Sequence, residues 1–197
     1  MKVTKAQAQE NRARIVETAS TLFRERGYDG VGVADLMAAA GFTHGGFYKH
    51  FGSKTDLMAE AAASGFSQSV ANIAGVDAVA FIKEYVSRKH RDALGHGCTL
   101  AALSGDAARQ PESIRRAFAT GIESQLAILE GEDGALSETA KREARAKRID
   151  TLAHVVGAIV LSRACPDDSA LADEILKVCR TRILSQHNQK IKGPNGG

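Results

Sequence analysis

Apolar residues recur along this chain at the three- and four-residue spacing of amphipathic helices. Near the amino terminus this spacing predicts a helix over residues 4–26, which Gly27 ends. The apolar positions of that helix share one face and are Ile15, Ala19, Leu22 and Phe23. Because the same spacing continues through most of the 197 residues, we expect an all-α fold.

Glycine, proline and capping residues divide the rest of the chain into further predicted helices. Short helices are expected from Thr43 and from Cys98. Another short helix is expected at residues 33–40, and longer helices are expected at residues 53–74, 77–94, 112–130, 137–164 and 168–186. Ser53 has the spacing of a capping box, and Pro111 stands where a first-turn proline is favoured. The glycines within residues 131–134 predict a loop.

The turn between the second and third predicted helices is the most specific local signal. Gly41 follows the last apolar residue of the second helix, where a left-handed backbone ends a helix. Thr43 can then cap the next helix through its hydroxyl. Two short helices joined by a three-residue turn form a helix-turn-helix, whose second helix enters the major groove of DNA. Double-stranded DNA is therefore the first partner that the sequence predicts.

Several motifs in this region resemble the DNA-binding domain of the TetR/AcrR family of bacterial repressors in both order and spacing. They are Gly27-Tyr28, Ala34-Asp35-Leu36, Gly41 and the run from Gly45 to Lys54. The resemblance covers roughly residues 10–58, while the remainder is similar only in length and helical character. It implies a three-helix helix-turn-helix domain followed by a helical-bundle domain for ligand binding and dimerisation. The expected limits are 1–52 for the first domain, 53–75 for a connecting helix, 76–189 for the second domain and 190–197 for a disordered tail.

The resemblance also implies which residues meet DNA. They are Thr43, His44, Gly45, Gly46, Tyr48, Lys49, His50 and Lys54. His44 can donate to guanine or thymine, and Lys49 to guanine or phosphate. Tyr48 and Lys54 match positions that grip phosphate in the family. His50 either touches DNA or buttresses the motif. Phe47 and Phe51 fall on the opposite face and are predicted to be core.

Adjacent glycines in the predicted DNA-reading helix depart from the family pattern. A glycine inside a helix is less favourable than alanine by about 1 kcal/mol, and Gly46 stands where threonine is common in the family. We hypothesise that Gly45 and Gly46 allow the backbone to approach DNA closely. Gly32 stands where the family favours a serine or threonine cap that contacts a DNA phosphate. The resemblance therefore does not carry this phosphate contact over to the present sequence.

The last two predicted helices carry broad apolar stripes, such as Ile149, Val156 and Val160 in one and Leu171 and Ile175 in the other. The pattern allows either a buried monomer core or a second subunit, and the resemblance implies a homodimer. The resemblance also implies a small-molecule effector that releases the protein from a palindromic operator. Candidate pocket residues are Phe81, Tyr85, Leu100, Leu103, Phe118, Ile122 and Val156.

Two alternative functions stay open at this point. Cys98 follows Gly97 at a predicted helix start, a location that favours a reactive thiolate, so it is a candidate redox or electrophile sensor. A buried structural cysteine is the other interpretation of the same position. The second alternative is a helix-turn-helix protein that organises DNA without an effector.

Composition and charge restrict the possible classes. The formal net charge of +3 is too small to indicate nucleic acid binding by itself, and acidic residues surround Arg12 and Arg14, whose helix face can be simply solvated. Three cysteines at unrelated spacings predict reduced thiols. The sequence has neither a signal segment nor an apolar run of about 20 residues, so we expect a cytoplasmic protein. No metal-ligand or catalytic spacing is found, so we expect no metal, no cofactor and no enzyme activity.

Overall fold

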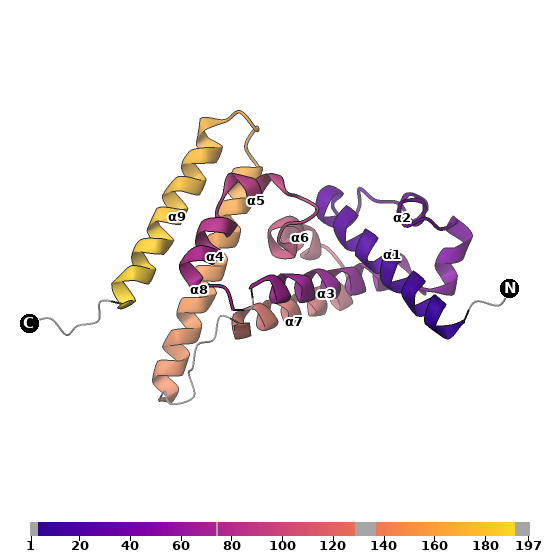
Figure 1. Cartoon of the computed structure of the whole chain (residues 1–197), viewed down its shortest axis with the longest axis horizontal. Coiled ribbons are helices and arrows are strands. Elements are labelled where there is room, and N and C mark those ends of the chain that lie inside the picture. The colour runs from indigo at the N-terminus through magenta and orange to yellow at the C-terminus, as the bar shows by residue number, and fades with distance from the viewer. Residues whose placement is uncertain (1–3, 74, 129–136, 192–197) are drawn as a thin grey trace, which may run out of the picture. The chain divides into compact units, whose positions relative to one another are not determined.

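The computed structural model describes residues 4–73, 75–128 and 137–191, with side chains as far as His187, and every regular element within them is a helix (Figure 1). This confirms the predicted all-α class. The elements are α1 Lys5–Arg26, α2 Val33–Ala39, the 3₁₀ helix η1 His44–Lys49, α3 Lys54–Ile73, α4 Ala78–Tyr85, α5 Arg88–Asp92, α6 Thr99–Ala107, α7 Glu112–Ile128, α8 Glu138–Arg163 and α9 Ala170–Ile191.

The chain forms two compact units. The first contains residues Met1–Ala71 and Leu94–Gln125, and the second contains residues Asn72–Ala93 and Leu126–Gly197. The limits of these units follow from how the helices pack. The limits expected from the sequence, at residues 52, 75 and 189, instead divide the chain by function, and they stay a prediction.

The first unit contains α1, α2, η1, α6 and nearly all of α3 and α7. Thr4 caps α1 by accepting from the Gln7 amide, and Gly27 ends it with a φ of 73°, as predicted. The helices close around a core of fully buried apolar side chains: Ile15, Phe23, Tyr28, Leu36, Met37, Phe47 and Leu57. Burial of such side chains is the main favourable term in folding, so this cluster fixes α2 and η1 against α1.

Hydrogen bonds attach the end of α1 to its neighbours in the first unit. The Asp106 carboxylate on α6 accepts from the Tyr28 amide at 3.0 Å, and the Lys54 ammonium at the start of α3 donates to the Tyr28 carbonyl at 2.6 Å. Arg24, buried on α1, donates to the Gly95 carbonyl at 2.8 Å. The backbone of one residue, Tyr28, thus connects three helices.

The second unit contains α4, α5, α8 and α9, with α8 and α9 lying side by side (Figure 1). Ser137 caps α8 by accepting from the Ala140 amide, and the buried Ser162 hydroxyl donates to the Ala172 carbonyl of α9 at 3.0 Å. One face of each of these two helices therefore packs against the other helix, and another face is exposed at the outer surface.

Two predicted helix limits are wrong. The helix expected over residues 77–94 is divided into α4 and α5, because Val86 leaves the helical conformation and the Ser87 hydroxyl accepts from the His90 amide to begin a new helix. The last helix begins at Ala170 and continues to Ile191, so the first two residues of the expected tail are helical. The rest of that tail and the expected loop at 131–134 lie outside the described residues.

Other predicted features are present. Gly75 has a φ of 75° after α3, and the Asp56 amide donates to the Ser53 hydroxyl at 3.1 Å at the start of α3. Among the described helices, none has the length and apolar character that crossing a membrane requires.

Candidate nucleic-acid interface

The turn between α2 and η1 is built by its backbone. Gly41 has a φ of 79°, the left-handed value predicted for it, and the Phe42 amide donates to the Met37 carbonyl at 2.8 Å. Thr43 is extended and precedes η1, but its hydroxyl makes no capping hydrogen bond, so that part of the prediction is wrong. Instead, the Gly46 amide donates to the Thr43 carbonyl at 2.9 Å, which closes the first turn of η1.

The predicted DNA-reading helix is present at the predicted place as a six-residue 3₁₀ helix. Short 3₁₀ segments are common where a sequence supports an α-helix poorly. Gly45 and Gly46 supply the reason, since glycine has low helix propensity. At the other end of η1, the His50 amide donates to the Phe47 carbonyl at 2.9 Å.

The side chains of η1 divide into a buried and an exposed face. Phe47 and Phe51 are buried, and their ring centroids lie 5.6 Å apart, as expected for core residues. Tyr48 is 72% exposed and packs the edge of its ring against Phe47 at 5.2 Å. The exposed residues, which we call the η1 outer face, are Thr43, His44, Gly45, Tyr48 and Lys49. The core rings therefore hold the η1 outer face toward solvent.

The two glycines of η1 are not required by the packing of this protein. A Cβ added to Gly45 would meet no atom within 4 Å. One added to Gly46 would lie 3.6 Å from the Met37 methyl and 3.8 Å from the Thr43 hydroxyl, which are ordinary contacts. Close approach of the η1 backbone to DNA at these glycines therefore stays a prediction.

Two predicted contact residues also have contacts inside the protein. The half-buried His50 ring lies between Phe42 and Phe51, with centroids 6.3 Å from each, so it does buttress the motif. The Lys54 ammonium bonds to the Tyr28 carbonyl and keeps two further donors. Contact of either residue with DNA stays a prediction.

Arg12 and Arg14 are not simply solvated, which was one interpretation of their sequence context. The Arg12 guanidinium lies 4.5 Å from the centroid of Phe51, and Arg14 lies equally close to Phe42. Arg12 also forms an ion pair with Glu60. The hydrogen bond within this pair raises the pKa of Arg12 above its ordinary value. Sequence spacing gave no signal for these pairings because they join distant segments.

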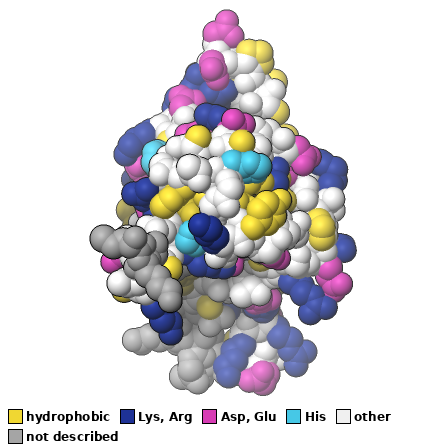
Figure 2. All heavy atoms as spheres, turned by 90° about the vertical axis from the view of Figure 1, so that its right-hand side faces the viewer, with side chains coloured by type: hydrophobic (Ala, Val, Ile, Leu, Met, Phe, Trp, Pro, Cys, Tyr) yellow, Lys and Arg dark blue, Asp and Glu magenta, His cyan; other side chains and the backbone are white. Residues whose placement is uncertain are grey.

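Basic residues do not form a continuous patch on the face seen in Figure 2, which views the protein from the side on which α2 lies in Figure 1. Lysine and arginine side chains lie mostly toward the outline of this face with acidic ones among them, and histidine and apolar side chains occupy its middle. The predicted DNA contact at this surface therefore rests on the shape and hydrogen bonding of the helix-turn-helix more than on bulk charge.

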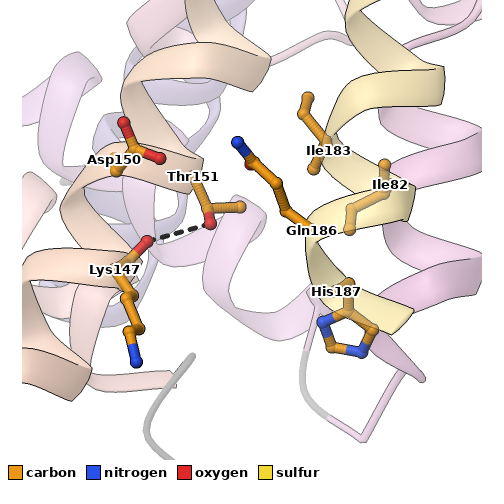
Figure 3. A pocket seen from close by; sticks show the side chains of 7 residues that line it. All are labelled: Ile82, Lys147, Asp150, Thr151, Ile183, Gln186 and His187. Atoms are coloured by element: carbon orange, nitrogen blue, oxygen red, sulfur yellow. Dashed lines mark hydrogen bonds between the residues drawn. The ribbon is translucent and has the colours of Figure 1, made fainter. Parts of the chain in front are cut away.

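A cleft of about 410 Å³ lies among α4, α8 and α9 in the second unit (Figure 3). Its lining residues are Ile82, Lys147, Asp150, Thr151, Ile183, Gln186 and His187. Ile82 and Ile183 are buried and form an apolar part, while the Thr151 hydroxyl already donates to the Lys147 carbonyl at 2.9 Å. The volume is in the range of small-molecule sites.

The pocket residues predicted from the sequence are different ones. None of the seven lines this cleft. Four of them fall in the first unit, namely Leu100, Leu103, Phe118 and Ile122, and three fall in the second, namely Phe81, Tyr85 and Val156. A ligand site formed by these seven residues stays a prediction.

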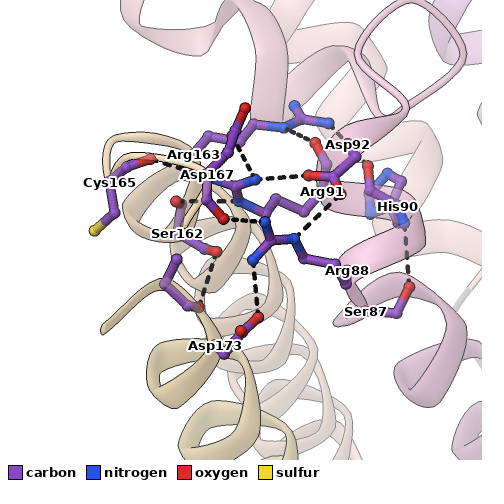
Figure 4. Close-up of polar contacts among 11 residues, drawn as sticks. Ser87, Arg88, His90, Arg91, Asp92, Ser162, Arg163, Cys165, Asp167 and Asp173 are labelled. Carbon is purple, nitrogen blue, oxygen red and sulfur yellow. Dashed lines mark hydrogen bonds and ion pairs between the residues drawn. The ribbon is translucent and has the colours of Figure 1, made fainter. Parts of the chain in front are cut away.

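Beside the cleft helices, α5 is attached to the end of α8 by arginine hydrogen bonds (Figure 4). Arg91 is 3% exposed and donates to the carbonyls of Ser162 at 3.2 Å and Cys165 at 3.0 Å. In return, Arg163 donates to the carbonyls of Arg91 at 2.8 Å and His90 at 3.0 Å. Asp92, whose pKa is lowered by its hydrogen bond from Arg91, completes the group. Charge-assisted bonds of this kind are among the stronger ones in proteins.

Cys98 precedes α6 at its cap position and is only 6% exposed. The three cysteines are reduced thiols, as predicted from their spacing. Among the described residues, no group of histidine, cysteine, aspartate and glutamate side chains could hold a metal ion. The helix position favours a sensor thiol, and the burial favours the structural interpretation.

Residues 15–61 match the family described as bacterial regulatory proteins, tetR family. The HTH-type transcriptional regulator TtgR of Pseudomonas putida is 44% identical over 55 residues, which are 28% of this chain and 26% of TtgR. The chain thus matches about a quarter of the length of that relative. A TetR transcriptional regulator from Chloroflexus aurantiacus shares the fold with a TM-score of 0.71 at 23% identity, over 93% of this chain and 97% of that one. AibR, in complex with isovaleryl coenzyme A and operator DNA, has a TM-score of 0.51 at 17% identity, over 86% of this chain and 96% of AibR.

Proposed function

This chain belongs, through its amino-terminal domain, to the TetR family of bacterial regulatory proteins, and on that premise we propose that it is a ligand-responsive transcriptional repressor. It binds a palindromic operator as a homodimer, and a small-molecule effector releases it. In this proposal the protein is not an enzyme and acts in the cytoplasm, where the chromosome lies.

The η1 outer face is the observation that carries the DNA-binding part of the proposal. His44 and Lys49 are exposed on a helix whose opposite face is anchored by the buried Phe47 and Phe51. A helix held in this way can enter a major groove and present donors to base edges and phosphates. The exposed Tyr48 hydroxyl adds a donor of the kind that binds phosphate.

Exposed apolar residues on α8 and α9 support the homodimer. They are Ile149, Val160, Leu161, Leu171 and Val178, and each is more than two-fifths exposed. Large apolar patches are uncommon on monomers, and a twofold pair of chains covers the same patch on both subunits. Such a pair places two reading helices on half-sites of a palindrome separated by about 34 Å.

Release by an effector follows from differential affinity for two states of the protein. A hundredfold loss of operator affinity needs an effector that favours the released state by about 2.7 kcal/mol. AibR, which has the same fold, was crystallised with isovaleryl coenzyme A and operator DNA together. We propose that the effector of this chain binds in the cleft among α4, α8 and α9.

The DNA-binding part is tested by fluorescence anisotropy with labelled duplexes from the regions flanking the gene. We expect the wild type to bind one of them, and Lys49→Ala and His44→Ala each to weaken binding by about tenfold or more, since a specific contact contributes about 1–3 kcal/mol. Lys83→Ala, which removes an exposed lysine on α4, is the matched control and should leave affinity unchanged. Failure of the wild type to bind any of the duplexes at low salt would sink the proposal.

Redox or electrophile sensing through Cys98 is a second candidate function. The observation that favours it is the cap position of Cys98 at the start of α6. Alkylation of the thiols should then abolish operator binding in the wild type and spare Cys98→Ser. Equal loss of binding in both proteins would remove this candidate. An effector-free DNA-organising role would instead give binding that responds to no small molecule and hardly depends on sequence.

A further inference from the structure

Arg14 occupies a defined position at the turn of the helix-turn-helix. Its guanidinium carbon lies 4.5 Å from the ring centroid of Phe42, the residue after Gly41. A Cβ on Gly41 would lie 3.0 Å from a terminal nitrogen of Arg14, so glycine leaves room for this approach. The cation of α1 is thereby held beside the segment that leads into η1.

No carboxylate neutralises Arg14 among the described residues. Glu10 and Glu17 stand four residues before and three after it on α1, a spacing at which ion pairs can form. Neither is in an ion pair with Arg14, and Glu10 instead accepts from the Gln7 amide group at 3.3 Å. The charge of Arg14 therefore remains available to an external anion.

Arg12 shows what a purely structural arginine looks like in the same helix. Its guanidinium also lies 4.5 Å from a ring centroid, that of Phe51. However, both of its terminal nitrogens donate to the two carboxylate oxygens of Glu60, which joins α1 to α3. Of the two stacked arginines, Arg12 has a carboxylate partner among the described residues and Arg14 has none there.

We propose that Arg14 binds a backbone phosphate of the operator, next to the base pairs that face η1. Stacking on Phe42 occupies one face of the planar guanidinium and leaves the N–H donors at its edge free, which is the geometry that arginine uses for phosphate. Stacking also restricts the side chain before DNA arrives, so less conformational entropy is lost on binding. This inference rests on the proposed DNA binding and adds a contact that the helix-turn-helix motif itself does not include.

The salt dependence of operator binding tests this contact. With the labelled duplex that the wild type binds, Arg14→Ala should weaken binding by about tenfold at low salt, as expected for a charged hydrogen bond. The slope of log affinity against log salt should fall in magnitude by about 0.9 per bound chain, since one phosphate contact releases its counterions. Arg14→Gln, which keeps much of the length without the charge, should lower the slope equally. Phe42→Leu should weaken binding severalfold and keep the slope.

Arg116→Ala is the matched control, because Arg116 is an exposed arginine on α7 that pairs with Glu112. It should change neither affinity nor slope. If the wild type binds and both Arg14 variants keep the wild-type slope, the phosphate contact is refuted while DNA binding stands. If the wild type itself binds no duplex, both ideas fail. Circular dichroism melting of each variant keeps loss of fold apart from loss of contact.

Discussion

Gly65 on α3 is a residue at which the packing of the first unit leaves no room for a side chain. A Cβ at this position would lie 2.8 Å from Arg24 and 3.0 Å from the Ser20 hydroxyl, and it would also collide with Thr99. All three neighbours are themselves buried. Glycine is therefore needed here for close approach and not for an unusual backbone.

The first prediction concerns stability. Gly65→Ala should destabilise the protein by about 1–3 kcal/mol through overpacking, measured by urea unfolding. Gly105→Ala on the exposed side of α6, where the added Cβ meets no atom within 4 Å, is the control. It should be neutral or stabilise by up to about 1 kcal/mol, because alanine favours helix. Equal stability of the two variants would show that the polar cluster around Gly65 can rearrange freely.

Gly46 provides the second prediction at this scale. Gly46→Ala should leave unfolding free energy within about 0.5 kcal/mol of wild type, because the new methyl makes only ordinary contacts. Operator affinity should fall by about tenfold or more if the backbone of η1 approaches DNA closely, a loss of about 1.4 kcal/mol. The measurement is anisotropy on the operator duplex. Unchanged or improved affinity would defeat the close-approach hypothesis.

At the scale of elements, α5 places a histidine in a setting that disfavours its charge. The Nδ1–H of His90 donates to the Tyr85 carbonyl at 2.7 Å, and the two rings lie 4.4 Å apart. Burial lowers the pKa of His90, and the positive charge of Arg163 lowers it further. The hydrogen bond to Tyr85 and the charge of Glu84 oppose this shift without cancelling it.

A pH dependence of stability follows as the third prediction. The unfolded chain takes up a proton at His90 as pH falls through about 6.5, while the folded protein resists it. Stability should therefore fall on acidification from that pH, by at most about 1.4 kcal/mol per pH unit. His90→Asn should flatten the dependence, measured as urea midpoints between about pH 7.5 and 5.5. A variant with the same pH dependence as wild type would assign the effect to other groups.

Local sequence is sufficient to predict most helices. It does not predict the contacts between residues that lie far apart in the sequence. The positive φ at Gly41 and the end of α1 at Gly27 follow from a property of glycine itself. Ser87 was missed because a serine can either continue a helix or cap a new one, and packing decides between these. The partners of Arg12 and Lys54 lie 48 and 26 residues away along the chain, a separation at which sequence spacing carries no information.

The same distinction applies to the candidate site. Phe47 and Phe51 were assigned to the core from helical spacing alone, which the structure confirms. The 3₁₀ form of η1 is not predicted from the sequence, because the low helix propensity of Gly45 and Gly46 indicates a weak helix but not its type. The cleft residues are not predicted, because a pocket depends on how three helices pack together. The apolar spacing within a single helix carries no information about that packing.

At the scale of the whole molecule, the exposed apolar residues of α8 and α9 predict a second copy of the chain as partner. The fourth prediction uses the double variant Leu161→Glu and Val178→Glu, whose side chains are 58% and 50% exposed. Light scattering should give about twice 20.9 kDa for the wild type and the single-chain mass for the variant, because buried unpaired carboxylates oppose association.

The control for the dimer test is Val76→Glu, since Val76 is an exposed apolar residue outside α8 and α9. It should leave the mass unchanged. Operator affinity of the double variant should fall by about a hundredfold or more, because single half-site binding loses the effective concentration of the second. A wild type that is already a single chain at micromolar concentration would contradict the twofold arrangement.

The backbone of Tyr28 has a consequence for exchange with solvent. Its N–H is held by Asp106 and its C=O by Lys54, so α6 cannot separate from α1 without exposing an amide that also borders α3. Deuterium uptake at this amide should therefore require opening of the whole first unit and be as slow as uptake in the middle of α1. A loop amide just outside a helix end would then rank among the slowest probes in the protein.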